Sequence, residues 1–149
     1  MEELSLIDQN LLLKIKSLLS DHEGYRRFPY FDTVGKITIG IGYNLTDRGL
    51  DDSIINSLVE KDIQYFYEQL NKKFDWFNEL SEARKCAIID MAYNLGMNKF
   101  LQFKKMITFL SIGDFENASK EMLNSKWASQ IKFRAVYDSE LIKNGVFKA

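Results

Sequence analysis

The sequence is poor in residues on which many functional sites depend, with one cysteine, one proline and one histidine among 149 residues. The single cysteine, Cys86, excludes an internal disulfide, and its apolar neighbours predict a buried small side chain rather than a nucleophile. The single histidine, His22, excludes catalytic sites that need two histidines and most metal sites built from several histidines.

The chain also lacks internal repeats, low-complexity segments and an apolar run long enough to cross a membrane. The first residues carry Glu2 and Glu3 where a secretory signal would carry positive charge, and polar residues interrupt the apolar positions that follow. We therefore expect neither a signal peptide nor a transmembrane segment, and we expect synthesis in a cytoplasm.

The chain also has no large excess of positive or negative charge, because its formal net charge is −1. Residues 1–80 hold 9 Lys and Arg against 14 Asp and Glu, whereas residues 81–149 hold 11 against 7. The resulting basic excess in the second half is modest, and solvated helix faces explain it as well as an anionic partner does. Without zinc spacing, a phosphate-binding glycine loop or a nucleic-acid motif, we expect no nucleic-acid partner.

The elements that are present predict an α+β fold, with helices segregated from a small sheet. Ser5 is expected to cap a first helix that ends at Gly24, and residues 26–44 predict two strands with a turn at Val34–Gly35. Pro29 suits an edge strand. The predicted helices that follow are residues 50–74, 81–96, 99–113, 114–125 and 134–145.

Two acidic residues fall within this early region. Glu23 is expected at the C-terminal end of the first helix, where the negative end of the backbone dipole disfavours a carboxylate and so suits a proton donor. Asp32 is expected near the hairpin turn, and Thr38 on the next strand could bind a water that Asp32 activates. Such a pair is what glycosidic bond hydrolysis requires. On physical grounds alone, however, a helix-end residue and a turn residue explain the same pattern.

The segment EGYRRFPYFDTVGKITIGIGYN resembles the phage-type lysozymes of glycoside hydrolase family 24. In that family eight residues lie between the Glu of a Glu-Gly pair and an Asp, five more lie between that Asp and a Thr, and an Ile-Gly-x-Gly run follows. Glu23, Asp32, Thr38, Gly40 and Gly42 occupy these positions without a gap. The resemblance implies that Glu23 is the general acid and that Asp32, assisted by Thr38, activates water.

The resemblance extends to ARKCAIIDMAYNLG, which is similar to the family's central buried helix, and to SKWASQIKFRA, which is similar to its tryptophan–glutamine–arginine segment. It implies that Arg134 pairs with the catalytic glutamate. The positions implied to contact the substrate are Tyr93, Asn94, Gln130 and Asn44.

Two positions depart from the family pattern, since Tyr43 stands where the family usually has His, and Ile131 follows the glutamine. We expect the first to affect stability and the second to affect fine substrate contacts. Trp76 and Trp127 are expected to pack in the core rather than to stack on sugars.

The implied architecture is a single lysozyme-like domain with a small β lobe over residues 21–52, a helical lobe over residues 1–20 and 74–149, a linking helix over residues 53–73, and a cleft between the lobes. The implied activity is that of an N-acetylmuramidase, acting on bacterial peptidoglycan with inversion and with carboxyl groups about 6.5–9.5 Å apart. No cofactor and no metal are expected, because two carboxyl groups and water suffice. We expect a monomer.

Alternatives remain at this stage. A lytic transglycosylase cleaves the same bond with a glutamic acid and no water nucleophile, and a non-catalytic peptidoglycan-binding protein could keep the fold. A phage endolysin is the expected biological form, made in the host cytoplasm and released to the cell wall by a membrane-permeabilising holin. A toxin or a phage tail component could also carry such a domain.

Overall fold

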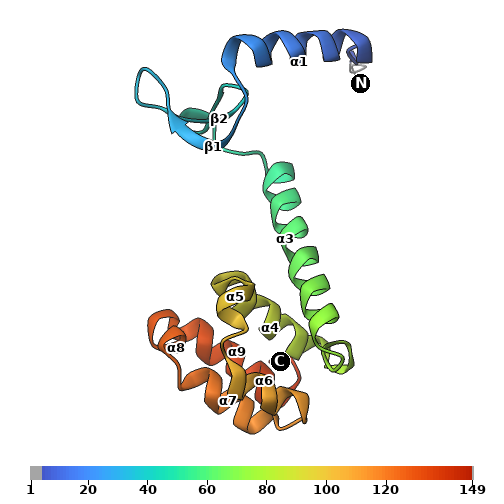
Figure 1. Ribbon diagram of the computed structural model, residues 1–149, viewed down its shortest axis with the longest axis vertical. Coiled ribbons are helices and arrows are strands. Elements are labelled where there is room, and N and C mark those ends of the chain that lie inside the picture. Colours follow the sequence, from blue (N-terminus) through green and yellow to red (C-terminus); the bar gives the residue numbers. More distant parts are fainter. Residues whose placement is uncertain (1–4, 149) are drawn as a thin grey trace. The chain divides into compact units, whose positions relative to one another are not determined.

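The protein is described by a computed structural model covering residues 5–148, in which residues up to Ile55 and residues from Asn56 form two compact units (Figure 1). Glu2 and Glu3, which the expectation about a signal peptide uses, lie outside the described residues. The α+β class is confirmed, because a small antiparallel sheet occurs in the first unit and the second is helical. The assignment of residues 1–20 to the helical lobe stays a prediction.

The first unit consists of one long helix, a small sheet and a short helix. Its elements are α1 (Gln9–Glu23), β1 (Arg26–Phe31), β2 (Ile37–Gly40), β3 (Tyr43–Asn44), α2 (Leu45–Arg48) and the start of α3 (Asp52–Lys73). The three strands are antiparallel in the order β1-β2-β3. Within the described part of this unit, Thr38 is the one buried residue.

The first helix begins three residues later than expected. Asp8, rather than Ser5, is the N-cap, because its carboxylate accepts hydrogen bonds from the N–H groups of Asn10 and Leu11. The prediction for Ser5 was therefore wrong, whereas the predicted end is confirmed. Gly24 closes the helix with φ of +81°, a conformation that costs glycine little.

The hairpin forms as predicted, but the second predicted strand is interrupted. The turn closes where the Gly35 N–H donates to the Asp32 carbonyl, and Pro29 lies in edge strand β1. Gly40 and Gly42 have φ of +68° and +64°, and these values are incompatible with a continuous strand. The chain therefore turns between β2 and β3, which the alternation of residues 37–44 did not reveal.

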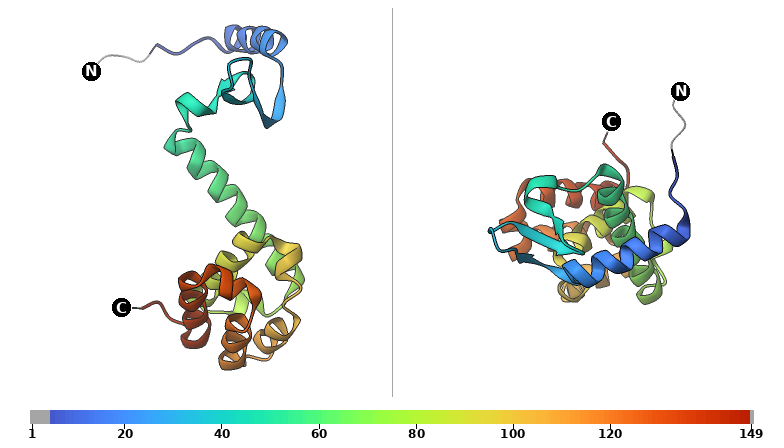
Figure 2. Two further views of the ribbon diagram at one scale, coloured as in Figure 1. Left: turned by 90° about the vertical axis from the view of Figure 1, so that its left-hand side faces the viewer. Right: turned by 90° about the horizontal axis from the view of Figure 1, so that it is seen from above.

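The second unit is a set of helices that share one hydrophobic core. Besides the rest of α3, its elements are the 3₁₀ turn η1 (Phe77–Glu79) and the helices α4 (Glu82–Leu95), α5 (Met97–Phe100), α6 (Lys104–Ser111), α7 (Phe115–Leu123), α8 (Lys126–Ile131) and α9 (Phe133–Asn144) (Figure 2). Helix α4 buries Ala87, Ile88, Met91 and Ala92, and it packs against α9. Helix α7 packs against both α6 and α9.

Several expectations for this unit are confirmed and others are corrected. Helix α4 has its N-cap at Ser81 and its C-cap at Gly96, as predicted. The predicted helix over residues 99–113 is two helices, because the chain turns between Phe100 and Lys104 and thereby buries both Phe100 and Met106. Helix α8 was missed.

The prediction for the single cysteine was wrong, whereas the predictions for the two tryptophans are confirmed. The side chain of Cys86 is exposed, so the prediction of a buried cysteine was wrong. The neighbouring residues Ala87 and Ile88 occupy the core-facing side of α4 instead. Both tryptophans pack as predicted, with Trp127 buried and Trp76 stacked on Phe74 against the core.

Candidate active site

Glu23 is the last residue of α1, and its carboxyl group lies against the turn between β2 and β3. A Cβ atom at Gly42 would lie 2.6 Å from Glu23 Oε2, which is closer than any side chain tolerates. Gly42 also has φ of +64°. Because Gly42 has no side chain, the turn admits the carboxyl group of Glu23. A Cβ atom at Gly40 would meet no neighbour within 4 Å.

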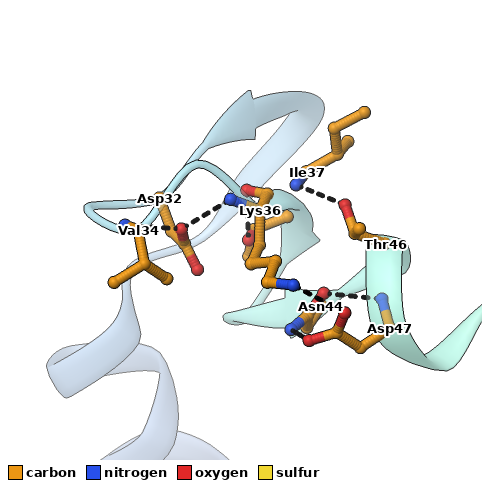
Figure 3. A network of polar contacts seen from close by, with 8 residues as sticks. Asp32, Val34, Lys36, Ile37, Asn44, Thr46 and Asp47 are labelled. Atoms are coloured by element: carbon orange, nitrogen blue, oxygen red, sulfur yellow. Dashed lines mark hydrogen bonds and ion pairs between the residues drawn. The ribbon is translucent and has the colours of Figure 1, made fainter.

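Asp32 is fixed by the hairpin turn that follows β1 (Figure 3). Its Oδ1 accepts hydrogen bonds from the N–H groups of Val34 at 2.9 Å and Lys36 at 2.8 Å. Among the described residues, Oδ2 of Asp32 has no hydrogen-bond donor. The turn therefore orients the carboxylate through one oxygen and leaves the other oxygen available to a water molecule or a substrate group.

Thr38 is on β2 with 4% of its surface exposed, and both Thr38 and Asp32 form a hydrogen bond with Lys36. The Thr38 hydroxyl donates to the Lys36 carbonyl at 3.2 Å, and the Asp32 N–H donates to the same carbonyl at 2.9 Å. Asp32 and Thr38 are thus diagonal neighbours across the antiparallel pair, a spacing of about 7–8 Å between Cα atoms. Because the hydroxyl proton is used, the oxygen of Thr38 can still accept a hydrogen bond.

At this same end of the sheet, Asp47 ties the hairpin to α2. Its carboxylate forms a salt bridge with Lys36 at 3.0 Å and accepts a hydrogen bond from Asn44 Nδ2 at 2.9 Å (Figure 3). The hydrogen bonds from Lys36 and Asn44 lower the pKa of Asp47. Asn44 Oδ1 also accepts the Asp47 N–H, so Asn44 caps α2. Its role as a substrate contact stays a prediction.

Tyr43 has its own contacts in this unit. Its hydroxyl donates to the Gly49 carbonyl at 2.6 Å, and the guanidinium of Arg48 lies 4.3 Å from the centroid of its ring. A tyrosine therefore joins β3 to the end of α2 through a hydrogen bond and a cation–π contact.

The remaining predicted residues lie in the second unit. Tyr93 and Asn94 are at the C-terminal end of α4, and Gln130 is on α8, and all three are exposed. Asn94 Oδ1 accepts a hydrogen bond from Trp127 Nε1 at 2.8 Å, so the core tryptophan fixes the orientation of this amide. Tyr93 lines a cavity of about 450 Å³ together with Ile63 of α3 and Arg134 of α9.

Arg134 is held by Asp90, a partner that the sequence did not suggest. Its Nε donates to Asp90 Oδ2 at 2.8 Å and its Nη2 donates to Asp90 Oδ1 at 2.6 Å, which is a two-point salt bridge. The hydrogen bond to Asp90 raises the pKa of Arg134, although burial opposes it. The predicted pairing of Arg134 with Glu23 stays a prediction.

The sequence indicates that Asp90 needs a partner, because Asp90 is the one charged residue in the apolar run CAIIDMAY, but it does not identify Arg134 as that partner. A carboxylate on the helix that forms a core needs a partner, and an arginine is the common solution. A second acidic residue, Asp138 on α9, is buried beside this pair and was also missed.

In residues 5–148, no group of three or more His, Cys, Asp or Glu side chains is arranged to hold a metal ion. No helix of that same part of the chain combines the length and the apolar character needed to cross a bilayer.

Comparison with known proteins gives one consistent result. The family model described as phage lysozyme matches residues 20–137. The chain is 28% identical over 168 residues to the probable T4-type lysozyme 1 of Dictyostelium discoideum, an alignment that covers 93% of this chain and 99% of that relative. It is 26% identical over 166 residues to the pre-baseplate central spike protein Gp5 of Enterobacteria phage T4, covering 93% of this chain and 29% of the spike protein.

Proposed function

The chain belongs to the phage lysozyme family, and we propose that it hydrolyses the β-1,4 bond between N-acetylmuramic acid and N-acetylglucosamine with inversion at the anomeric carbon. Its general activity is that of a lysozyme-type peptidoglycan hydrolase, a glycoside hydrolase. The observation that carries the proposal is the pair of carboxyl groups in the first unit, each positioned by a different backbone feature.

Glu23 is the proposed general acid. Its carboxyl group is seated against Gly42 at the end of α1. Glu23 donates its proton to the glycosidic oxygen as the bond from that oxygen to the anomeric carbon breaks. The leaving sugar departs as a neutral alcohol.

Asp32 and Thr38 are the proposed water-binding pair. Asp32 Oδ2 accepts one hydrogen from the water, and the Thr38 oxygen accepts the other, because its own proton is engaged by the Lys36 carbonyl. This leaves a lone pair of the water free to attack the anomeric carbon from the face opposite the leaving oxygen. Asp32 takes the proton that the water loses.

The supporting residues are proposed from the family pattern and from their contacts. Tyr93, Asn94 and Gln130 are exposed and are proposed to contact the saccharide or its peptide. Arg134 is proposed to support the charge of the acid in the reaction. Asn44 is proposed as a further contact, made by a side chain that α2 already holds in place.

The proposed biological role is that of a phage endolysin, a monomer that a holin releases to the bacterial cell wall. The similarity to a phage spike protein supports a second context, in which such a domain belongs to a virion. The two contexts share the reaction.

Analysis of the products tests the reaction directly. Purified peptidoglycan is digested, and the released muropeptides are identified by mass spectrometry. The proposal predicts reducing N-acetylmuramic acid ends. Anhydromuramic ends would establish a transglycosylase and would remove the role assigned to Asp32. Intact peptidoglycan, with protein bound to it, would establish a binding module.

The stereochemistry is tested separately by following the anomeric proton of the first product by NMR before mutarotation. Inversion predicts that the new reducing end forms as the α anomer from the β-linked substrate. An initial β anomer would establish retention, and the carboxylate of Asp32 would then be a nucleophile rather than a base.

A further inference from the structure

The second unit contains a pair of carboxyl groups that the proposed reaction does not use. Asp90 is on α4 and Asp138 is on α9, and these two helices pack against each other. Asp138 has 2% of its surface exposed. Arg134 lies one helical turn before Asp138 on α9, and its guanidinium is bound to Asp90 through two nitrogens.

The charges in this cluster do not balance if both aspartates are ionised. Among the described residues that line the two cavities at this cluster, Arg134 is the one cation and Asp90 and Asp138 are the two carboxyl groups, and the other titratable groups are Cys86 and Tyr93 of α4 and Tyr137 of α9. The charged residues of α7 and α8, which also pack against α9, are Glu116, Lys120, Glu121 and Lys126, and none of them sets the pKa of Asp138. Asp138 Oδ2 is buried and has no hydrogen-bond partner among the described residues.

The two carboxyl groups respond to this environment in opposite directions. Burial, a hydrogen bond with Asp90 and the charge of Asp90 raise the pKa of Asp138 to about 9, and Arg134 opposes them. Burial alone would raise the pKa of Asp90, but the hydrogen bonds with Arg134 and Asp138 and the charge of Arg134 lower it. A protonated Asp138 can donate to Asp90, whereas an ionised one cannot.

We propose that Asp90 and Asp138 share a single proton at neutral pH, and that this pair positions the guanidinium of Arg134. The inference rests on the proposed function, because the supporting role of Arg134 is proposed there. One shared proton makes the cluster neutral. Asp90 then holds Nε and Nη2 of Arg134, and Nη1 makes no hydrogen bond to the described residues, so it stays available.

Loss of that proton changes what Arg134 binds. With Asp138 ionised, two carboxylates compete for one guanidinium, and the repulsion between them is not compensated. The two-point salt bridge to Asp90 is then no longer the best arrangement. Asp90 and Asp138 are therefore positioning residues, and their effect on Arg134 depends on pH in the alkaline range.

A direct test is ¹³C NMR of the aspartate carboxyl carbons in the full chain. The resonance of Asp138 is identified by its loss in Asp138→Asn, which is close in shape to the protonated acid and keeps a donor for Asp90. The proposal predicts that this resonance keeps the chemical shift of a protonated carboxyl at neutral pH and titrates well above it. Titration at about pH 4, the ordinary range for aspartate, would overturn the proposal.

A second variant checks that Asp90 is the proton-sharing partner. In Asp90→Asn the like charge is removed, and Arg134 is free to bind Asp138. The midpoint of the Asp138 titration should therefore fall by at least about one pH unit, toward the ordinary range for aspartate. The matched control is Asp62→Asn on the exposed surface of α3, which should leave the titration of Asp138 unchanged. An unchanged titration in Asp90→Asn would contradict the shared proton.

Unfolding in urea gives the thermodynamic counterpart. The pKa of Asp138 is higher in the folded chain than in the unfolded chain, so its contribution to stability is complete below about pH 4 and declines as the pH rises toward about 9. The equilibrium constant for unfolding of the wild type should rise by up to about tenfold per pH unit in that window relative to Asp138→Asn. Identical pH dependence in the two proteins would contradict the proposal.

The functional readout is the pH profile of kcat. Between neutral and alkaline pH, Asp138→Asn should lose a smaller fraction of its own activity than the wild type does, because its amide cannot ionise. Equal fractional losses in the two proteins would show that Asp138 does not position Arg134 by sharing a proton. Failure of the proposed hydrolysis itself would appear as absent products, whereas the NMR titration would be unaffected.

Discussion

At the scale of single residues, the position of Glu23 depends on the absence of a side chain at Gly42. Gly42→Ala would place a Cβ atom 2.6 Å from Glu23 Oε2 and would strain a backbone with φ of +64°. We expect the catalytic rate to fall by at least about tenfold, because the acid is displaced from its seat. The unfolding free energy should fall by about 1–2 kcal/mol. Turnover of peptidoglycan and urea unfolding measure the two effects.

The matched control is Gly49→Ala in the same unit. Gly49 has φ of +60° and ψ of −160°, also a backbone conformation that L side chains rarely adopt, but a Cβ atom there would meet no neighbour within 4 Å. This variant should lose stability and should keep its activity. If both variants lose activity equally, backbone strain rather than displacement of Glu23 is responsible.

The two oxygens of Asp32 have separate tasks, and amide substitution separates them. Asp32→Asn keeps an oxygen acceptor for the N–H groups of Val34 and Lys36 but removes the negative charge. We expect kcat to fall by about 10²–10⁴-fold while the unfolding free energy changes little. Asp32→Ala should lose activity and also destabilise the turn. Full activity in Asp32→Asn would show that Asp32 is a turn residue only.

Residue types in a fixed pattern made the candidate acid and base predictable from the sequence. Glu23, Asp32 and Thr38 lie on one continuous segment that forms a helix end, a turn and a strand. Each of these structures is formed by residues that are close in the sequence, so it can be predicted from that short stretch. Asp90 and Asp138 belong to different helices, and Arg134 meets Asp90 across 44 positions of the chain. The spacing of these residues along the sequence does not predict such a contact.

At the scale of elements, the end of α9 is held by a side chain from α4. Arg84 Nε donates to the Ile142 carbonyl at 2.7 Å, Nη2 donates to the Lys143 carbonyl at 3.2 Å, and the guanidinium lies 3.5 Å from the centroid of the Phe115 ring. Arg84 thus satisfies carbonyl groups that a helix C-terminus leaves without partners. It joins α4, α7 and α9.

Removal of this side chain should therefore destabilise the second unit. We expect Arg84→Ala to lower the unfolding free energy by about 2 kcal/mol, since charged donors to two carbonyl groups are lost. Urea unfolding followed by circular dichroism measures it. Lys85→Ala is the control, because the one hydrogen bond of the Lys85 side chain to the described residues is a 3.5 Å contact with Asn78. Equal stability of the two variants would contradict the capping role.

The ends of a helix were predictable where the sequence has a residue that commonly caps helices. Ser81 and Gly96 bound α4 as expected, and Gly24 ends α1. The break between β2 and β3 was not predictable. The same residue pattern is compatible with a continuous alternating strand and with a strand that is interrupted by glycines with positive φ. The split of residues 99–113 into two helices depends on the core, which both helices must reach.

At the scale of the whole molecule, the α+β class followed from the order of the elements, whereas the partition into units ending at Ile55 and beginning at Asn56 required coordinates. The net charge of −1 conceals opposite balances in the two halves of the chain. Composition bounded what this chain does, and the motif of residues 23–42 gave the activity that family membership supports.

The most direct test compares the muropeptides released from one peptidoglycan preparation by the wild type, Glu23→Gln and Glu60→Gln. Glu60 is an exposed residue of α3 and provides the matched loss of one carboxylate. We predict that reducing muramic ends form with the wild type and with Glu60→Gln, and that they fall by at least about 10²-fold with Glu23→Gln. Undiminished release by a folded Glu23→Gln would contradict the assignment of Glu23 as the general acid.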